Sequence, residues 1–523
     1  MSTTGPPAAR PRPSPLSAGG WSGASFLISQ AVGSLLYLPL ARLLTPADFG
    51  LITEAALVST GLTLVGELSL TRGLVRLDGD RDRLAQATLR LSLLVGLIGA
   101  LLCALAGLPM AAIFGDQRLR LLLLMLAPAV LATALGTVPH ALLARELDFR
   151  RKTLPETVSI GCGGLAALGA ALLGAGVYSL VLYTVIRTTL SSAVAWRVVG
   201  WRPPAGQRPD RTVMRRILGY GLPASGGDLA LYARLNTDYA VTGRRLGTDA
   251  LGVYTLAWNA AASPAAILSS AFGGVGFATF SRLQQDRPRL RAVYFSATRL
   301  IAALAFPLFA SAVFIREELV EVAYGARWGG MVAPLLPLFL LQGVREVCRP
   351  GASLTLALGY SRLYALCGAL MLPLTLTAVL IGSRSGITGV AWAMLAAVGG
   401  ASLVWPAIAI ALLRPSPVLL ARTFGLPLLL ALAAAPAVAG TNMLLTGMEL
   451  PAALRLILSI LAGLLTFLAV ARLCWSALRR DLACLRVALP DHGALEPSPP
   501  LASPHSADPE APVAPLALPA MER

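Results

Sequence analysis

The side chains best placed to do chemistry inside an apolar stretch are Arg234, Asn236 and Asp238. An arginine guanidinium binds phosphate oxygens through two parallel hydrogen bonds, and an intramembrane aspartate can exchange a proton or a cation. Arg234 and Asp238 are four residues apart and would share one face of a helix, so an ion pair that only orders the helix is an alternative interpretation. The stretch therefore predicts either a site for an anionic group or a coupling ion, or a helix held by an internal ion pair.

Further ionisable and amide residues lie in other apolar stretches, where a polar group facing lipid is costly and marks a pathway by default. The predicted substrate or cavity residues are Arg187, Arg234, Asn236, Asp238, Asn259 and Arg345. The predicted residues for a coupling ion are Glu54, Asp228 and Asp238. The six cysteines show no CxxC spacing and the three histidines are dispersed, so we expect no metal site and assign no catalytic residue.

The composition is that of a polytopic membrane protein. The chain has 523 residues, of which 56% are hydrophobic and 13% are charged, and its mean hydropathy is +0.71. A soluble domain is about one quarter charged. Apolar runs of roughly 20 residues, the length that crosses a bilayer, recur along the chain and are continuous, as in helices and unlike barrel strands. The net charge of +17 comes from arginines spread through the loops, so no nucleic acid is expected as a partner.

We expect an all-α fold with about 14 transmembrane helices. The predicted spans are 20–41, 48–70, 87–108, 119–141, 156–175, 177–198, 217–243, 250–276, 292–315, 331–356, 363–382, 387–412, 424–444 and 451–473. Arginines concentrate in alternate loops, and the positive-inside rule places these loops and both chain termini in the cytoplasm.

A passage near the start of the chain recurs 202 residues later. Residues 41–55 match residues 243–257 at several positions, which include the pair Gly50 and Gly252. Because six predicted spans separate each residue from its counterpart, the two copies would insert the same way round, as parallel repeats. The sequence thus predicts two parallel six-helix repeats around a central cavity, with two appended helices.

The predicted domains follow from the spans and from the Pro, Ser and Ala enrichment of both ends. They are a disordered cytoplasmic N-terminus (1–19), an N-lobe of spans 1–6 (20–200), a basic cytoplasmic linker (201–216), a C-lobe of spans 7–12 (217–413), spans 13 and 14 (414–475), and a largely disordered cytoplasmic tail (476–523).

Enzyme motifs are missing from the sequence. No phosphate-binding loop of the GxxxxGK[ST] type occurs, so direct use of ATP is not expected. A membrane glycan polymerase or transferase needs acidic residues or a sizeable domain on the outer face, and the predicted outer loops are short. We therefore expect a transporter without a cofactor, and coupling to H+ or Na+ stays open.

An ordered set of segments resembles the polysaccharide-transporter branch of the multidrug/oligosaccharidyl-lipid/polysaccharide exporter superfamily: ARLLTPADFG at 41–50, ALLARELDFR at 141–150, NTDYAVTGRRLG at 236–247, LGVYTLAWN at 251–259 and YGARWGGMVAPLLPL at 324–338. The resemblance covers roughly residues 20–475. It implies a protein of the bacterial inner membrane whose two lobes alternate between inward-open and outward-open states. The Asn-x-Asp feature that recurs in this family falls on Asn236 and Asp238.

The resemblance also implies a substrate. The protein would flip undecaprenyl-diphosphate-linked oligosaccharide for the export of exopolysaccharide, lipopolysaccharide O-antigen or capsule. Its partners would be this lipid-linked oligosaccharide and membrane lipids, with a polysaccharide polymerase and export proteins as further candidates. The alternatives are a cation-coupled small-molecule or drug exporter of the same superfamily, a flippase for the peptidoglycan lipid precursor, and a membrane glycan polymerase.

Overall fold

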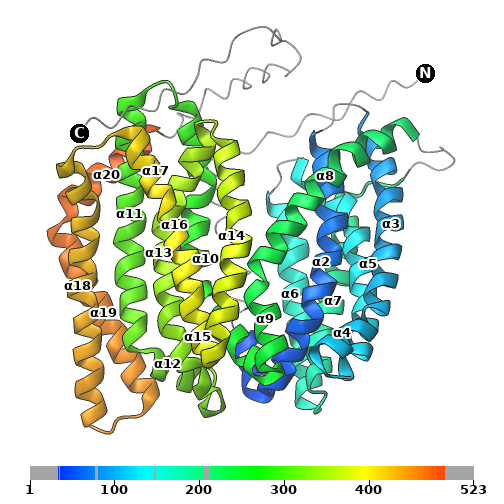
Figure 1. Cartoon of the computed structure of the whole chain (residues 1–523), viewed down its shortest axis with the longest axis horizontal. Helices are drawn as coiled ribbons and strands as arrows, with labels where there is room; N and C mark the ends of the chain where they lie inside the picture. The colour runs from blue at the N-terminus through cyan, green and yellow to red at the C-terminus, as the bar shows by residue number, and fades with distance from the viewer. Residues whose placement is uncertain (1–32, 34–35, 77–79, 146–148, 204–210, 489–523) are drawn as a thin grey trace, which may run out of the picture. The chain divides into compact units, whose positions relative to one another are not determined.

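The computed structural model describes residues 33, 36–76, 80–145, 149–203 and 211–488, and this part of the chain is helical without a strand (Figure 1). The helices up to residue 200 are α2 (Pro46–Arg76), α3 (Arg81–Leu105), α4 (Gly107–Phe114), α5 (Arg118–Arg145), α6 (Phe149–Leu172) and α7 (Val177–Val199). The expected all-α fold is confirmed.

The second half of the chain continues with helices of the same kind. They are α8 (Arg211–Leu235), α9 (Thr237–Leu246), α10 (Thr248–Arg282), α11 (Arg287–Phe314), α12 (Arg316–Ala323), the 3-10 helix η1 (Ala326–Met331), α13 (Val332–Ala357) and α14 (Ser361–Gly382). After these come α15 (Gly386–Met394), a π-helical turn (Leu395–Gly399), α16 (Gly400–Ser402), α17 (Val404–Leu413), α18 (Pro417–Gly447), α19 (Ala452–Leu473) and α20 (Trp475–Ala488).

The order of elements repeats between the two halves. The long helix α3 is followed by the eight-residue helix α4, and the long helix α11 is followed by the eight-residue helix α12. A glycine with positive φ comes after each short helix, at Gly115 (φ 82°) and Gly325 (φ 96°). Side chains disfavour this backbone region, so glycine suits both turns. The correspondence of elements supports the internal repeat that the sequence indicates.

The matched glycines Gly50 and Gly252 lie where α2 packs against α10. A Cβ atom on Gly50 would overlap the carbonyl oxygen of Thr248, and a Cβ atom on Gly252 would overlap the carbonyl oxygen of Pro46. Pro46 and Thr248 are the first residues of their helices and are also 202 positions apart. In each repeat, the backbone at the start of this helix therefore contacts the glycine of the other repeat. The two backbones are so close that a side chain larger than that of glycine would not fit.

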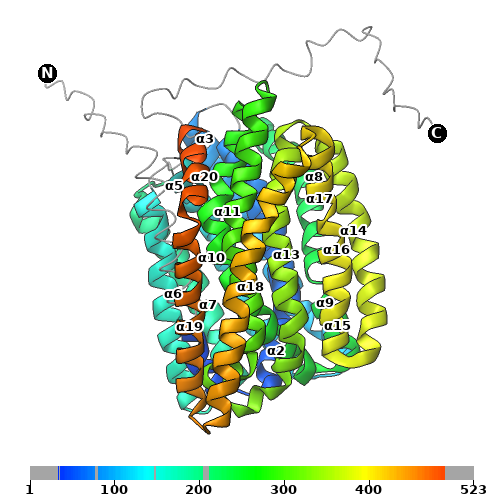
Figure 2. The same cartoon turned by 90° about the vertical axis from the view of Figure 1, so that its left-hand side faces the viewer.

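The C-terminal helices cover one face of α11 and α12 (Figure 2). Arg455 of α19 pairs with the buried Glu318 of α12, with 3.4 Å between Nη1 and Oε1. Asp481 of α20 accepts hydrogen bonds from Ser296 Oγ at 2.8 Å and from Arg299 Nη1 at 2.9 Å, both on α11. Residues 476–488, which the sequence analysis assigns to the tail, thus form most of a docked helix, and the rest of the predicted tail lies outside the described residues.

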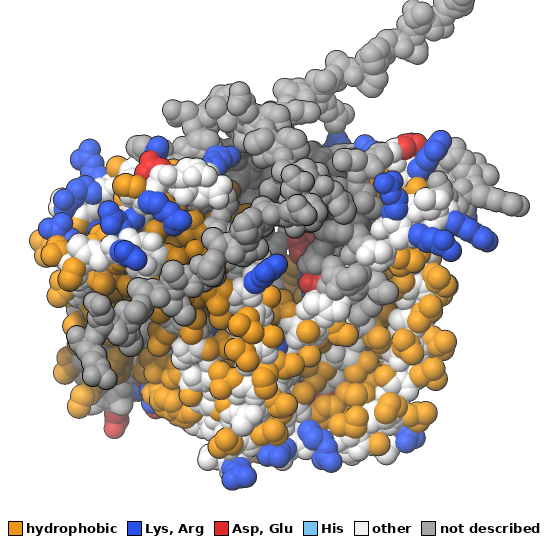
Figure 3. All heavy atoms as spheres, turned by 45° about the horizontal axis from the view of Figure 1, so that its top comes forward, with side chains coloured by type: hydrophobic (Ala, Val, Ile, Leu, Met, Phe, Trp, Pro, Cys, Tyr) orange, Lys and Arg blue, Asp and Glu red, His pale blue; other side chains and the backbone are white. Residues whose placement is uncertain are grey.

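Many large apolar side chains are exposed on the outer surface of the helices. Figure 3 shows a belt of apolar side chains through the middle of one face, with Lys and Arg side chains along both rims. Among the described residues, ten helical segments are long and apolar enough to cross a membrane, and one of them, 361–413, contains two predicted spans. The polytopic membrane fold is confirmed. The total of 14 spans stays a prediction, because the ten segments correspond to eleven of the predicted spans. The predicted spans 48–70 and 217–243 are not among these segments, and the span 20–41 lies largely outside the described residues.

Candidate functional site

A cavity of about 720 Å³ lies between α8, α9, α10 and α13. Its polar wall carries Asn236 at the junction of α8 and α9, Ser269 on α10, and the α13 residues Gln342, Arg345, Glu346 and Arg349. Because amide, carboxylate and guanidinium groups meet here inside an apolar bundle, this cavity is the candidate functional site.

Asn236 interrupts the predicted span 217–243. Helix α8 ends at Leu235 and α9 begins at Thr237, while Asn236 has φ −118° and ψ 12°, outside the helical region. The Nδ2 atom of Asn236 donates a hydrogen bond of 2.8 Å to the carbonyl oxygen of Tyr232. A broken helix of this kind is tolerated at membrane depth where it lines a cavity, and Asn236 does line this one.

Asp238 lies in the first turn of α9 and is only 1% exposed. The hydroxyl group of Tyr254 donates to its Oδ2 atom at 2.9 Å, and Oδ1 has no hydrogen-bond partner among the described residues. The ion pairs of the described residues do not include one between Asp238 and Arg234. The break at Asn236 separates these two residues, so the predicted internal ion pair is not formed in this structure.

The face of α13 toward the cavity carries two arginines, one helical turn apart. Arg349 Nη2 lies 2.6 Å from Glu346 Oε1, and Ser269 Oγ on α10 donates to Glu346 Oε2 at 2.8 Å. Arg345 Nη1 donates to Gln342 Oε1 at 3.3 Å. Two guanidinium groups thus lie beside one carboxylate, which pairs with Arg349, so this cluster keeps an excess of positive charge.

The structure brings together only some of the predicted site residues. Asn236 and Arg345 line the cavity, and Arg345 also interacts electrostatically with Arg234 and Asp238. The residues that lie elsewhere are the exposed Arg187 and Asn259, the half-buried Asp228 and the buried Glu54. The role of every one of these residues stays a prediction.

The sequence analysis missed Arg349, Gln342 and Trp258, all of which line the cavity. Arg349 is an ionisable residue within the predicted span 331–356 and is one helical turn from Arg345, so the rule that found Arg345 also applies to it. Gln342 carries no charge and Trp258 is largely apolar, so neither stands out as an intramembrane ionisable group does. No pattern in one sequence separates them from residues that face lipid.

One end of the bundle, where α4, α9 and α12 lie, is held together by contacts between the two halves of the chain (Figure 1). Trp328 Nε1 donates to the carbonyl oxygen of Ala41 at 2.8 Å, and Arg327 Nη1 donates to that of Leu44 at 3.1 Å. The contact of Gly50 with Gly252 lies at the same end. We call this region the closed end.

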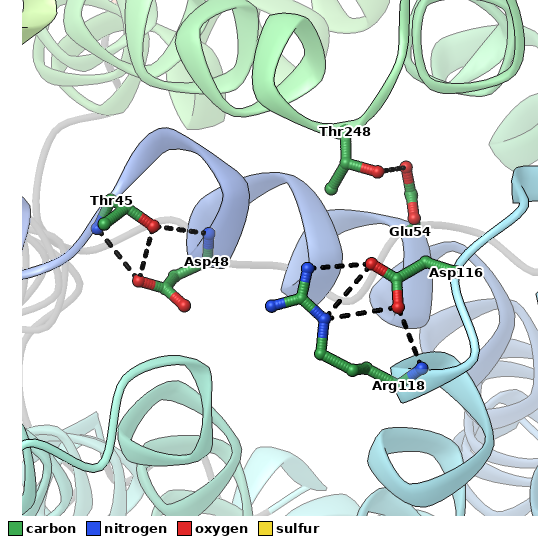
Figure 4. Close-up of polar contacts among 6 residues, drawn as sticks. All are labelled: Thr45, Asp48, Glu54, Asp116, Arg118 and Thr248. Atoms are coloured by element: carbon green, nitrogen blue, oxygen red, sulfur yellow. Dashed lines mark hydrogen bonds and ion pairs between the residues drawn. The ribbon is translucent and has the colours of Figure 1, made fainter.

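Glu54 is buried at the closed end with 0% exposure (Figure 4). The hydroxyl group of Thr248, at the start of α10, donates to Glu54 Oε1 at 3.1 Å, and Oε2 has no hydrogen-bond partner in the part of the chain that the structure describes. Asp116 and Arg118 lie nearby and form an ion pair, with 2.8 Å between Arg118 Nη2 and Asp116 Oδ2. The hydrogen bond from the Arg118 side chain lowers the pKa of Asp116. The hydrogen bond from Thr248 to the buried Glu54 side chain thus joins α2 to α10.

Comparison with known proteins identifies the family. Residues 39–333 match the family described as polysaccharide biosynthesis protein. The chain belongs to this family. The match contains α2 to α12 and ends at the start of α13, and the resemblance to polysaccharide transporters is confirmed.

Members of the polysaccharide biosynthesis family with curated names are distant in sequence. The succinoglycan biosynthesis transport protein ExoT of Rhizobium meliloti is 24% identical over 309 residues, which cover 59% of this chain and 62% of ExoT. The lipopolysaccharide biosynthesis protein WzxC of Escherichia coli is 23% identical over 345 residues, which cover 64% of this chain and 68% of WzxC. The matched region thus spans somewhat less than two thirds of the length of ExoT.

Solved structures share the fold of this family member. The lipid II flippase MurJ in an inward closed conformation superimposes with a TM-score of 0.70 at 14% identity, over 88% of this chain and 99% of MurJ. An inward-facing multidrug resistance transporter of the MATE family superimposes with a TM-score of 0.57 at 16% identity, over 78% of this chain and 97% of that structure. Both likenesses concern the fold.

Proposed function

We propose that this protein flips undecaprenyl-diphosphate-linked oligosaccharide across the bacterial inner membrane, for the export of exopolysaccharide, O-antigen or capsule. The observation that carries the proposal is the cavity between α8–α10 and α13, in a member of the polysaccharide biosynthesis family. Its wall holds two arginines, Arg345 and Arg349, beside the single carboxylate of Glu346, which pairs with Arg349. Guanidinium groups bind phosphate oxygens bidentately, and such contacts are strong where water is scarce.

Alternating access gives the closed end its role. We assign the closed end to the periplasmic side, because the arginine-rich loops lie at the opposite ends of the long helices and the positive-inside rule favours the cytoplasm for them. Both chain termini are then cytoplasmic, and the structure corresponds to an inward-facing state. To release the glycan outside, the contacts of Gly50 with Thr248 and of Glu54 with Thr248 must open.

The names of relatives favour transport over the other candidate activities. ExoT is named as a transport protein, and the structural neighbours are a flippase and multidrug transporters, so we assign the chain to transporters and not to enzymes. The family match favours polysaccharide precursors over drugs or the peptidoglycan precursor. Coupling to H+ or Na+ at Glu54, Asp228 or Asp238, and cooperation with a polymerase or export proteins, remain parts of the proposal.

The test is polysaccharide production in a deletion strain without a second flippase gene. We expect polymer to be lost and lipid-linked units to accumulate on the cytoplasmic side, and the wild-type gene to restore polymer. The double variant Arg345→Gln/Arg349→Gln should fail to restore it at normal protein levels. The control Arg362→Gln changes an exposed arginine at the start of α14 and should rescue fully. Normal polymer in the deletion strain would refute the proposal.

A further inference from the structure

We infer that Trp258 and Tyr239 form a platform for a sugar ring at the deep end of the cavity, and that the glycan enters with its sugars ahead of its diphosphate. This inference rests on the proposed function and assigns the two ends of the cavity to two parts of one substrate. Both aromatic residues line the cavity, Trp258 from α10 and Tyr239 from α9.

The aromatic residues and the arginines lie at opposite ends of the cavity, as their positions along α10 and α13 show. Helix α10 starts at the closed end, and Trp258 precedes Ser269 by eleven residues, which is about 16 Å along the helix axis. Ser269 bonds Glu346 of α13, so the arginines beside Glu346 lie at the level of Ser269. The aromatic residues therefore lie near the closed end, and the arginines lie farther from it.

Trp258 is held in place by other aromatic rings. Its ring centroid is 6.4 Å from that of Tyr239, at an interplanar angle of 77°, and 6.3 Å from that of Tyr254. Tyr254 is fully buried and its hydroxyl group is bonded to Asp238. The negative face of an aromatic ring attracts the partly positive C–H groups of a pyranose, and a ring that is already fixed loses little entropy on binding. Asp238 thus acts on the platform through Tyr254, as a positioning residue.

Amide groups complete the platform. Gln342 is 2% exposed and lies on the cavity wall, one helical turn from Glu346 toward the closed end. Its Oε1 atom accepts from Arg345, while its Nε2 atom is buried and has no hydrogen-bond partner within the described ranges. Buried donors are normally paired, so Nε2 would gain a partner if the Gln342 side chain turned toward an acceptor in the cavity, such as a sugar hydroxyl oxygen. Asn236 supplies a second amide on the facing wall.

Small side chains leave room for a ring between the platform and the arginines. Ala262, Ala265 and Ala266 of α10 line the cavity between Trp258 and Ser269. Aromatic and amide groups are typical of sugar recognition, and paired arginines are typical of diphosphate recognition. The order of these groups along the cavity matches the order of sugar and diphosphate in a lipid-linked glycan that is drawn in from the membrane by its head.

The test separates sugar binding from anion binding in the purified full-length protein in lipid nanodiscs. Saturation-transfer NMR would report binding of methyl hexopyranosides, and 31P line broadening would report binding of inorganic pyrophosphate. We expect Trp258→Leu to lose the saturation-transfer signal and keep pyrophosphate broadening, with Trp258→Phe intermediate. Arg345→Gln/Arg349→Gln should show the reverse. The control Trp392→Leu changes a tryptophan that is 47% exposed on α15 and should behave as wild type.

Pyrophosphate broadening also shows that each Trp258 variant is folded. The inference is overturned if Trp258→Leu keeps the wild-type glycoside signal, or if wild type gives no glycoside signal at all. Failure of the proposed function has a different signature, because a deletion strain with normal polymer would leave the binding pattern of the purified protein unchanged.

Discussion

At the scale of residues, the charge of the cavity comes from two arginines beside one buried carboxylate. Glu346 has a side chain that is 3% exposed and accepts from both Arg349 and Ser269, whereas the Arg349 side chain is 44% exposed. A buried carboxylate that loses its cation is costly, because its charge is then poorly solvated. The same pair therefore contributes to stability and to the binding of an anion, and substitutions can separate the two contributions.

We predict that Arg349→Gln lowers the free energy of unfolding by about 1–2 kcal/mol. The effect is no larger because solvent screens the partly exposed Arg349 side chain. The double variant Arg349→Gln/Glu346→Gln should regain most of that loss, because neither side chain then carries an unpaired charge. It should still bind pyrophosphate less tightly than wild type, since one guanidinium is missing. Thermal unfolding in detergent and 31P broadening measure the two effects. A double variant as unstable as Arg349→Gln would show that the unpaired charge of Glu346 does not cause the loss of stability.

At the scale of elements, the two halves approach each other closely where α2 packs against α10. We predict that Gly50→Ala destabilises the protein by about 1–3 kcal/mol, because the added methyl group meets backbone atoms that cannot turn away. The control Gly440→Ala lies inside α18 with open space around it and should be neutral or slightly stabilising. Melting temperatures of both variants test this, and equal values would contradict the packing argument.

The sequence predicts the long elements well and their interruptions poorly. The predicted span 177–198 almost coincides with α7 (Val177–Val199), because continuous apolar runs determine such helices. The break at Asn236 has no proline or glycine beside it and depends on a local bond to Tyr232, so no pattern indicates it. Helix α20 is amphipathic and short, and its Asp481 finds Ser296 and Arg299 only in the folded chain.

Some residues of the candidate site can likewise be predicted from the sequence, and others cannot. Burial cost alone identifies Arg345 as a cavity residue, because an arginine at that depth needs a polar neighbour. The positions of Arg187 and Asn259 depend on the rotation of α7 and α10 about their axes, and both side chains are exposed, away from this cavity. Helix rotation is decided by packing against neighbouring helices, which a single sequence does not contain.

At the scale of the whole molecule, the closed end joins segments that are 194 to 287 residues apart in the sequence. We predict that Thr248→Val opens this end, because Glu54 then loses its hydrogen-bond donor while it stays buried. If the closed state loses about 1.4 kcal/mol of free energy relative to the open state, the ratio of closed to open molecules falls tenfold. Thr466→Val is the matched control, since the Thr466 hydroxyl group bonds only within α19.

Spin labels at Leu173 and Arg384, in a cysteine-free background, would report this shift as a distance distribution. Both residues are exposed, and each follows the helix that ends near the closed end in its own half of the chain. A longer distance in Thr248→Val, with the control unchanged, is the expected result. Identical distributions would mean that the contact between Glu54 and Thr248 does not hold the two halves together.

The reciprocal contact of Gly50 and Gly252 has the geometry of a dimer interface contained in one chain. Each repeat offers a glycine and the start of a helix, and each receives the same pair from the other, as in an isologous two-fold contact between identical subunits. A protein made of a single repeat could therefore form this contact with a second copy of itself. Gene duplication and fusion of such a self-associating half would yield the present chain without any new interface.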